Sequence, residues 1–222
     1  MKMEGEHVET ATEACSETRE EAYSETCEEA YSEAYEDALR LAVVAHRQQT
    51  RKGSGFPYII HPVHVSVLLL RHGFSTEAAI AGLLHDIVED QGYALAEIKQ
   101  QFGPRVAEIV DALSERKYDD RGEKRAWRVR KREALEQMRT ASRDAVAVKA
   151  ADALHNAESF LEDLEQKGPQ IWCQFNQGAE LQLAYYREIV DVSRERLGPH
   201  PLVEELTETV HILAQAIKET SL

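Results

Sequence analysis

The chain has 222 residues, enough for one domain of ordinary size and an appendage. A hydrophobic fraction of 43% and a charged fraction of 30% are typical of a globular protein. The net charge of −14 disfavours nucleic acid as a partner, because an acidic surface repels phosphate backbones. No uncharged apolar run reaches the roughly 20 residues of a membrane span. No basic-then-apolar signal pattern opens the chain, so we expect a cytoplasmic protein without a membrane partner.

The first residues form an acidic, repetitive segment. Residues 1–40 contain thirteen Asp and Glu against three Lys and Arg, a net charge of −10, which leaves −4 for the other 182 residues. The stretches ACSETREE, AYSETCEE and AYSEAYED follow one another at a spacing of eight. We interpret residues 1–30 as an N-terminal extension. It is either the frayed start of a helix that begins near Tyr31 or a disordered acidic tail, and docking of a partner is a third interpretation.

Residues 31–222 predict an all-α domain of about eight to ten helices, because apolar residues recur at the helical period and no window alternates for long at period two. A loop at 50–62 interrupts the pattern, with Gly53, Gly55, Pro57 and Pro62 as breakers. The expected helices cover residues 36–49, 63–73, 75–90, 94–103, 104–115, 123–140, 142–166, 178–198 and 202–219.

Two segments of these helices, 78–88 and 145–154, are apolar on every side. Such helices normally lie in the centre of a bundle. Each nonetheless carries acids at or near its C-terminal end, and buried carboxylates are costly unless something pairs with them. Two central helices that deliver carboxylates to one interior point indicate a metal site.

The ionisable residues near these helices have the types and spacing of metal ligands. His85 and Asp86 are neighbours in LLHDIVED, Asp152 lies in KAADALHN, and His61 precedes both at a helix start fixed by Pro62. Two histidines and two aspartates form a mixed nitrogen and oxygen shell, which suits Mn²⁺, Fe²⁺ or Zn²⁺ better than Ca²⁺. Adjacent side chains on a helix point about 100° apart. One ion would therefore bind both His85 and Asp86 only from beside the helix, with other helices completing the shell.

Each of these signals is weak alone. A single His-Asp pair is common, a histidine on an apolar helix is usually a core residue, and carboxylates at a helix end are usually solvated. The ordered set HP, HDIVED and KAADALHN, on helices expected to be central, is what favours the metal interpretation. His64 is an alternative ligand. The other histidines are interpreted as surface or core residues: His46, His72, His155, His200 and His211.

Taken together, the segments HRQQTRKGSGFPYIIHP, LLHDIVED, EIKQQFGPRVAEIVDALS and VKAADALHN resemble the HD-domain phosphohydrolases. Within them they resemble the small alarmone hydrolases, the stand-alone relatives of the RelA/SpoT hydrolase domain. The similarity covers about residues 38–160, with weaker traces to about 190. It implies an HD-domain helical bundle over residues 31–222. It also implies a metal-dependent enzyme that removes pyrophosphate from the 3′ position of guanosine tetra- or pentaphosphate, with this small nucleotide as its partner.

The resemblance also assigns roles to residues. Glu89 and Asp90 match the acid pair that acts beside the metal, where they would hold a water molecule and carry its proton. The residues that match the metal ligands, usually of Mn²⁺, are His61, His85, Asp86 and Asp152. The resemblance also implies a nucleotide pocket, whose cations would neutralise phosphates. The residues that we assign to it are Arg51, Lys52, Lys149, Asn156, Arg130, Lys131 and Tyr185, with Tyr186 as an alternative to Tyr185. For Arg51 and Lys52 the other interpretation is a solvated loop pair.

Two positions depart from the family pattern. Trp127 stands where these hydrolases often carry a lysine, four residues before Lys131, and Leu181 stands in place of a pocket arginine. Both affect recognition of the distal phosphates and leave the metal ligands untouched. The basic run RGEKRAWRVRKR at 121–132 is a solvated helix face, part of a polyanion pocket, or a nucleic-acid contact.

Three functions follow from these observations. We favour a Mn²⁺-dependent hydrolase of guanosine 3′-polyphosphates or their adenosine analogues. The alternative is an HD phosphohydrolase of another specificity, such as a nucleotidase or phosphodiesterase, which Trp127 and Leu181 favour. A non-catalytic, partner-binding protein is the third, and the complete ligand set argues against it. The sequence does not indicate an oligomeric state.

Overall fold

A computed structural model describes residues 32–220, except for positions 53, 169 and 172–177. The expected extension at 1–30 lies outside the described residues. The described chain folds into helices joined by loops, with isolated β-bridges from Thr50 to Pro57 and from Tyr118 to Lys124. The all-α fold class is confirmed. The helices are α2 (Glu33–Ala45), α3 (Ile60–Arg71), α4 (Thr76–Leu84), α5 (Ile87–Gln91), α6 (Leu95–Leu113), α7 (Trp127–Thr140), α8 (Arg143–Lys167), α9 (Ala179–Leu197) and α10 (Pro201–Thr220).

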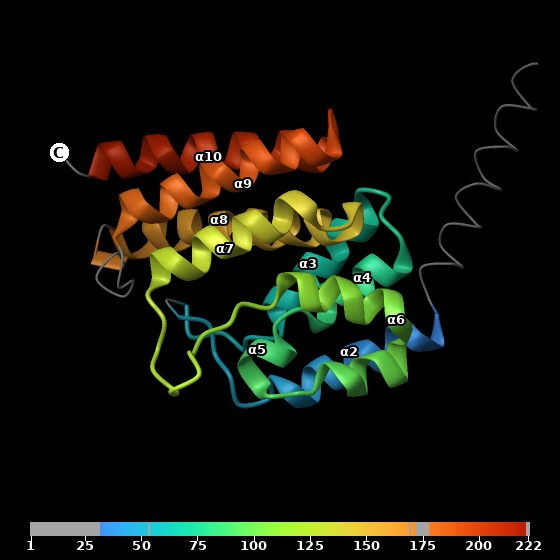
Figure 1. Ribbon diagram of the computed structural model, residues 1–222. Helices are drawn as coiled ribbons and strands as arrows, with labels where there is room; N and C mark the ends of the chain where they lie inside the picture. The colour runs from blue at the N-terminus through green and yellow to red at the C-terminus, as the bar shows by residue number, and fades with distance from the viewer. Residues whose placement is uncertain (1–31, 53, 169, 172–177, 221–222) are drawn as a thin grey trace, which may run out of the picture.

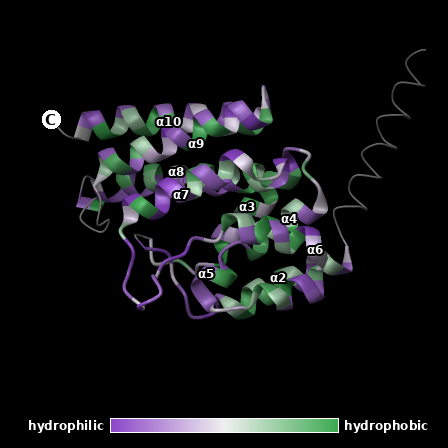
Figure 2. Cartoon of the chain, in the orientation of Figure 1, coloured by the Kyte–Doolittle hydropathy of each residue, from purple (hydrophilic) through white to green (hydrophobic). Residues whose placement is uncertain are grey.

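The helices form two groups that meet along α8. In Figure 1, α7–α10 lie in the upper part of the view and α2–α6 lie below them. Helix α8 packs against α9 and α10 on one side and against α3 and α4 on the other. Hydrophilic loops gather near α5 and the start of α7 (Figure 2). Within the described residues, no helix combines the length and apolar character needed to cross a membrane.

Helices α4 and α8 are central, as their apolar pattern predicts. Every residue of α4 from Ala78 to Leu84 is buried. The segment Ala145–Leu154 of α8 is also buried, except for the half-buried Lys149 and Asp152. Helix α4 lies so close to α3 that a Cβ atom added to Gly82 would be 2.8 Å from Leu69 Cδ1. Helices α4 and α8 therefore form a rigid support for the polar residues that they carry.

The structure corrects the single helix expected at 75–90. Helix α4 ends at Leu84 and α5 begins at Ile87, and His85 and Asp86 form a turn between them. The His85 Nδ1–H group donates to the Gly82 carbonyl oxygen at 2.7 Å. In a continuous helix this carbonyl would accept from the amide of residue 86. The break turns the side chains of both residues toward one interior point.

Other helix boundaries differ less. The expected break between 94–103 and 104–115 is confirmed within α6, where Gly103 has a φ of 87° and a ψ of 168°. Glycine reaches this conformation without the penalty that a Cβ atom imposes. Helix α7 begins at Trp127 instead of Glu123, because residues 118–124 form a turn closed by a β-bridge. Helix α3 begins at Ile60, three residues before the expected start.

We expect Gly82→Ala to lower the free energy of unfolding by about 1–2 kcal/mol, in the range for overpacking a close-packed core. The added methyl group would force the buried Leu69 side chain, and with it α3, away from α4. Urea unfolding curves measure the change, and Gln100→Ala on the exposed side of α6 serves as the control. An unchanged midpoint for Gly82→Ala would contradict the close helix approach.

Candidate active site

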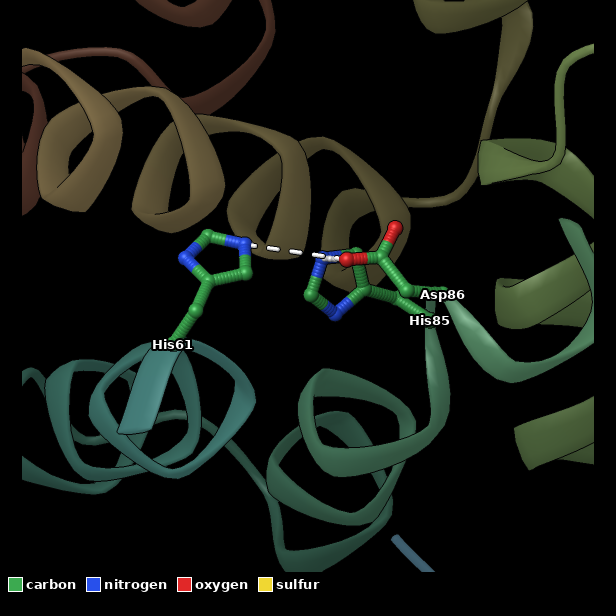
Figure 3. Close-up of side chains that lie close together, drawn as sticks. All are labelled: His61, His85 and Asp86. Carbon is green, nitrogen blue, oxygen red and sulfur yellow. Dashed lines mark ion pairs between the residues drawn. The ribbon is translucent and has the colours of Figure 1, made fainter. Parts of the chain in front are cut away.

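Three polar side chains from the break between α4 and α5 and from the start of α3 converge in the interior. His61 is the second residue of α3, His85 follows the last residue of α4, and Asp86 precedes α5. One ligand atom from each lies within 4.8 Å of the other two. Figure 3 shows the two imidazole rings and the carboxylate turned toward one another. Both histidines are buried, with exposed fractions of 1% for His61 and 6% for His85.

Asp152 of α8 approaches the same point from the opposite side. Its Oδ1 atom is 3.2 Å from His61 Nε2 and 4.0 Å from His85 Nε2. Asp86 Oδ2 is 3.2 Å from His85 Nε2 and 3.8 Å from His61 Nε2. The structure thus brings together the four side chains expected as ligands. His64 lies outside the cluster, on the exposed side of α3. Its ring centroid is 4.4 Å from that of His155.

Each histidine of the cluster is oriented by a partner at its other ring nitrogen. His85 Nδ1 donates to the Gly82 carbonyl oxygen, so Nε2 is left to face the cluster. His61 Nδ1 lies 2.7 Å from His155 Nδ1. Burial lowers the pKa of His155 to about 3, which leaves this ring neutral and able to accept the His61 proton. In both histidines Nδ1 is engaged elsewhere and Nε2 is the ring nitrogen that faces the cluster, which is the arrangement that suits a metal ligand.

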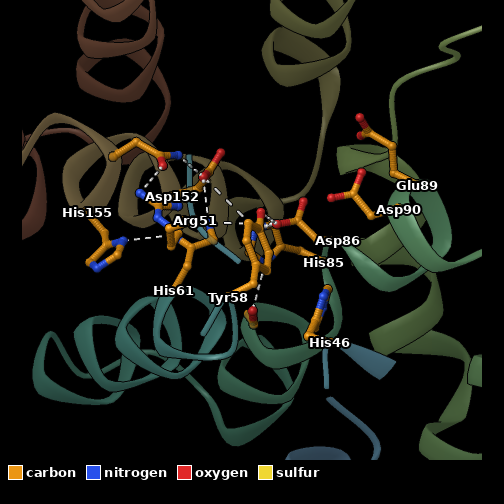
Figure 4. Close-up of polar contacts among 12 residues, drawn as sticks. His46, Arg51, Tyr58, His61, His85, Asp86, Glu89, Asp90, Asp152 and His155 are labelled. Carbon is orange, nitrogen blue, oxygen red and sulfur yellow. Dashed lines mark hydrogen bonds and ion pairs between the residues drawn. The ribbon is translucent and has the colours of Figure 1, made fainter. Parts of the chain in front are cut away.

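The carboxylates are fixed in the same way. Tyr58 Oη donates to Asp86 Oδ2 at 2.5 Å, as Figure 4 shows. Asp152 accepts from Lys149 Nζ at 2.9 Å on Oδ2 and from Asn156 Nδ2 at 2.5 Å on Oδ1. Burial alone would raise the pKa of Asp152, but Lys149 and the histidines hold it well below the usual value. Both aspartates are therefore held ionised.

A divalent ion fits this donor set. His85 Nε2 is buried and has no hydrogen-bond partner in the described part of the chain, so it is a polar atom that a metal would satisfy. Two ionised carboxylates face two imidazole nitrogens, and together they form the mixed shell that Mn²⁺, Fe²⁺ or Zn²⁺ accepts. Two negative charges at one buried point also require positive charge nearby.

The acid pair lies one turn beyond the cluster, on α5. Lys117 Nζ is 3.0 Å from Glu89 Oε1 and also binds Asp90 Oδ1. The Glu115 main-chain amide donates to Glu89 Oε2 at 3.2 Å, and Gln49 Nε2 donates to Asp90 Oδ2 at 3.1 Å. Burial opposes the charge of Lys117, but the two carboxylates raise its pKa. No sequence pattern marks Lys117, because its loop has no helical periodicity that would place the side chain.

A cavity of about 380 Å³ opens beside the cluster and the acid pair. Of the residues assigned to the nucleotide pocket, five line it: Arg51, Lys52, Lys131, Lys149 and Asn156. Arg130 and Tyr185 do not line the cavity and lie behind it. Tyr185 contacts the Lys131 ammonium with its ring, at 4.9 Å, and packs edge-on against Trp127.

Glu115 neutralises two of the expected substrate contacts. Its carboxylate is 2.5 Å from Lys131 Nζ and 2.7 Å from Arg130 Nη1, and its side chain is 5% exposed. Burial alone would raise the pKa of Glu115, but Lys131, Lys149 and Arg130 keep it below the usual value. No pattern in the sequence marked this residue, since the contact joins the end of α6 to α7. Lys131 therefore faces the cavity already paired with an anion.

Several known proteins with similar sequences are named for the same activity. The HD domain family profile matches residues 38–178. Three relatives are named guanosine-3′,5′-bis(diphosphate) 3′-pyrophosphohydrolase. MESH1 of Mus musculus is 37% identical over 138 residues, 61% of this chain and 72% of the relative. MESH1 of Danio rerio is 32% identical over 170 residues, 75% of this chain and 86% of the relative. The Haemophilus influenzae protein is 39% identical over 122 residues, 52% of this chain and 17% of the relative.

Two solved structures have a similar fold. One is described as a metazoan orthologue of SpoT that hydrolyses ppGpp, with a TM-score of 0.67 and 27% identity over 82% of this chain and 96% of that one. The other is a Listeria monocytogenes protein with a TM-score of 0.62 and 33% identity over 69% of this chain and 97% of that one. The chain spans less than a fifth of the Haemophilus influenzae and Aquifex aeolicus relatives, 17% and 11% of their lengths.

The fold and the cluster define an all-helical, metal-binding class of protein. The profile match at 38–178 covers more than half of the 222 residues, and the chain belongs to the HD domain family. Membership implies a divalent metal, which agrees with the cluster formed by His61, His85 and Asp86.

We expect Tyr58→Phe to weaken binding of a divalent metal by about 10- to 100-fold, the usual cost of losing a partner of a ligand. Without the Tyr58 hydroxyl, Asp86 Oδ2 loses its 2.5 Å hydrogen bond, so the carboxylate is less well oriented. Titration calorimetry measures the affinity. Tyr35→Phe, which removes a hydroxyl bonded to Ser66 away from the cluster, is the control. Equal affinity in the two variants would contradict a role for Tyr58.

We also expect metal uptake near neutral pH to release about one proton. Without metal, burial alone would lower the pKa of His85, but Asp86 and Asp152 raise it to about 9. A proton and a metal ion therefore compete for Nε2, and the apparent affinity should increase with pH up to about 9. Calorimetry in two buffers with different protonation enthalpies counts the protons. Identical binding enthalpies in both buffers would contradict the competition.

Proposed function

We propose that this chain is a metal-dependent hydrolase that removes the 3′-pyrophosphate of guanosine tetra- or pentaphosphate. With the tetraphosphate, water would enter and GDP and pyrophosphate would leave. The observation that carries the proposal is the convergence of two histidines and two aspartates beside an acid pair, at the wall of a cation-lined cavity. Support also comes from the names of two MESH1 relatives, of which the match covers 72% and 86%. Mn²⁺ as the ion and the cytoplasm as the location remain predictions.

The acid pair supplies the proton transfer in this proposal. When bound, the ion would polarise a phosphoryl oxygen and make hydroxide available near neutral pH. Glu89 and Asp90 hold the attacking water and accept its proton. Lys117 lies between their carboxylates, so its charge offsets the repulsion between two neighbouring anions. The main-chain amide of Glu115 donates to the other oxygen of Glu89.

Arg51 and Lys52 bind the phosphates in this proposal. Five cations line the cavity, and three of them are paired with carboxylates: Lys117, Lys131 and Lys149. Arg51 donates to the neutral Asn156 amide at 3.1 Å, and neither Arg51 nor Lys52 has an ion-pair partner among the described residues. These two side chains therefore carry the positive charge that an incoming polyphosphate would meet.

One set of observations favours a second function, an HD phosphohydrolase that acts on another nucleotide. Lys131 is paired with Glu115. Trp127, which packs against Tyr185, occupies the position where a lysine is common in the resembled hydrolases. Both features reduce the positive charge available at that end of the cavity. A substrate with fewer phosphates there, such as a simple nucleotide, would fit this charge distribution better.

A substrate panel separates the two functions. The Mn²⁺-loaded protein is incubated with guanosine tetraphosphate, its adenosine analogue, and simple mono- and triphosphates, and the products are resolved by chromatography. The first function predicts GDP and pyrophosphate in equal amounts, and no product with Asp86→Ala. Orthophosphate from simple nucleotides, with intact guanosine tetraphosphate, would replace the first function with the second.

We expect Arg51→Ala to raise KM for guanosine tetraphosphate by at least about tenfold, because one charge-assisted hydrogen bond contributes about 1.5–3 kcal/mol. The change in kcat should be smaller, since Arg51 does not contact the acid pair. Steady-state kinetics measure both. Arg47→Ala, which removes an exposed arginine outside the cavity, is the matched control and should leave KM unchanged. Equal effects of the two substitutions would remove Arg51 from substrate binding.

A further inference from the structure

The side chain of Gln49 contacts Asp90, one member of the acid pair, and two further side chains. Its Nε2 atom donates to Asp90 Oδ2 at 3.1 Å. Its Oε1 atom accepts from Gln91 Nε2 at 2.5 Å and lies 2.7 Å from His46 Nδ1. Gln49 follows α2 and Asp90 lies on α5, so this contact joins two elements 41 residues apart.

The contact with Asp90 fixes the orientation of the Gln49 amide. A carboxylate oxygen only accepts hydrogen bonds, so the NH₂ group must face Asp90 and the carbonyl must face His46. Since the carbonyl also only accepts, His46 Nδ1 must carry a hydrogen. His46 is 1% exposed and its Nε2 atom has no partner in the described structure. A hydrogen on Nε2 would be a buried donor without an acceptor, so the contact selects the Nδ1–H form of the ring.

We propose that Gln49 is a positioning residue for Asp90, an inference that rests on the proposed function of the acid pair. Lys117 holds Asp90 Oδ1 and Gln49 holds Oδ2, so both oxygens of the carboxylate are fixed. His46 and Gln91 act on Asp90 only through Gln49, because they hold its carbonyl and prevent the amide from turning over. Without Gln49, Lys117 alone restrains the carboxylate, and the side chain loses its fixed direction toward the cavity.

A purely structural role for Gln49 would have a different consequence. The main-chain carbonyl of Gln49 accepts from the Tyr58 amide at 2.9 Å and closes the loop that carries Arg51 and Lys52. Damage to this loop would weaken substrate binding and raise KM. Loss of the side-chain contact with Asp90 would instead lower kcat, since it disturbs proton transfer in the bound complex. The main-chain contact remains in every side-chain variant, so the two roles are separable.

Two substitutions test the role by kinetics. Gln49→Met removes the donor at similar side-chain length, and Gln49→Glu places a carboxylate against Asp90. We expect kcat to fall by about 10- to 100-fold, part of the 10²–10⁴ that a positioned acid or base contributes. Gln49→Glu should show the larger loss, with KM changed by less than about threefold and the bound metal unchanged. Gln48→Glu adds the same charge at the exposed neighbouring residue and should match the wild type.

A measurement independent of turnover tests the contact itself. In ¹⁵N-labelled protein, Asp90→Ala should shift the side-chain amide resonance of Gln49 and leave that of Gln48 in place. An unshifted Gln49 resonance, or a raised KM with wild-type kcat in Gln49→Glu, would overturn the inference. If the wild type leaves guanosine tetraphosphate intact, the proposed substrate fails, and the resonance shift still decides whether Gln49 holds Asp90.

Discussion

The arrangement of this protein depends on the burial of two ionised carboxylates among apolar helices. Asp86 and Asp152 face His61 and His85 at distances of 3.2–4.0 Å, at the junction of α3, α4 and α8. Burying a charge costs several kcal/mol unless opposite charge and hydrogen bonds accompany it. Lys149 neutralises one carboxylate, and a divalent ion would neutralise the rest. Because α4 and α8 are apolar, the two carboxylates need positive charge and hydrogen bonds from their neighbours in the site.

The partners of the four ligand side chains come from elements far apart in the chain. Tyr58 comes from the loop after α2, Gly82 from α4, and Lys149, His155 and Asn156 from α8. Each hydrogen bond orients a ligand side chain, and the contact between His61 and His155 also ties α3 to α8. The cluster thus connects the two groups of helices, and its geometry depends on how α3, α4 and α8 pack. This explains why a substitution such as Gly82→Ala, which changes only packing, would also displace the Gly82 carbonyl that orients His85.

The sequence predicted the helices, and it selected the four side chains that the structure brings together, because both leave local patterns. His85 and Asp152 lie on segments that are apolar on every side, and such segments are central in a bundle. The sequence could not predict contacts made by loops. Glu115 and Lys117 lie between α6 and α7, where no periodicity sets the direction of a side chain. The sequence indicates only that His46 is a surface or core residue. The 2.7 Å contact between His46 Nδ1 and Gln49 Oε1 depends on the packing of α2 against α4 and α5. The break after Leu84 was also missed, because the segment LLHDIVED has full helical periodicity and only the His85 side chain interrupts it.

The distribution of charge in the cavity explains how one pocket can hold both metal ligands and an anion. Cations and carboxylates both line it, and Arg51 and Lys52 lie on the loop that reaches α8 through the contact of Arg51 with Asn156. Lys117, Lys131 and Lys149 each pair with a carboxylate and hold it in place, Lys117 at the acid pair and Lys149 at Asp152. Arg51 reaches the same network through the Asn156 amide, which donates to Asp152. In the proposed function that link joins a phosphate-binding side chain to a metal ligand, so a substrate that draws Arg51 toward its phosphates would also act on Asp152. Substrate binding and the orientation of the proposed metal ligands would then be coupled through one amide.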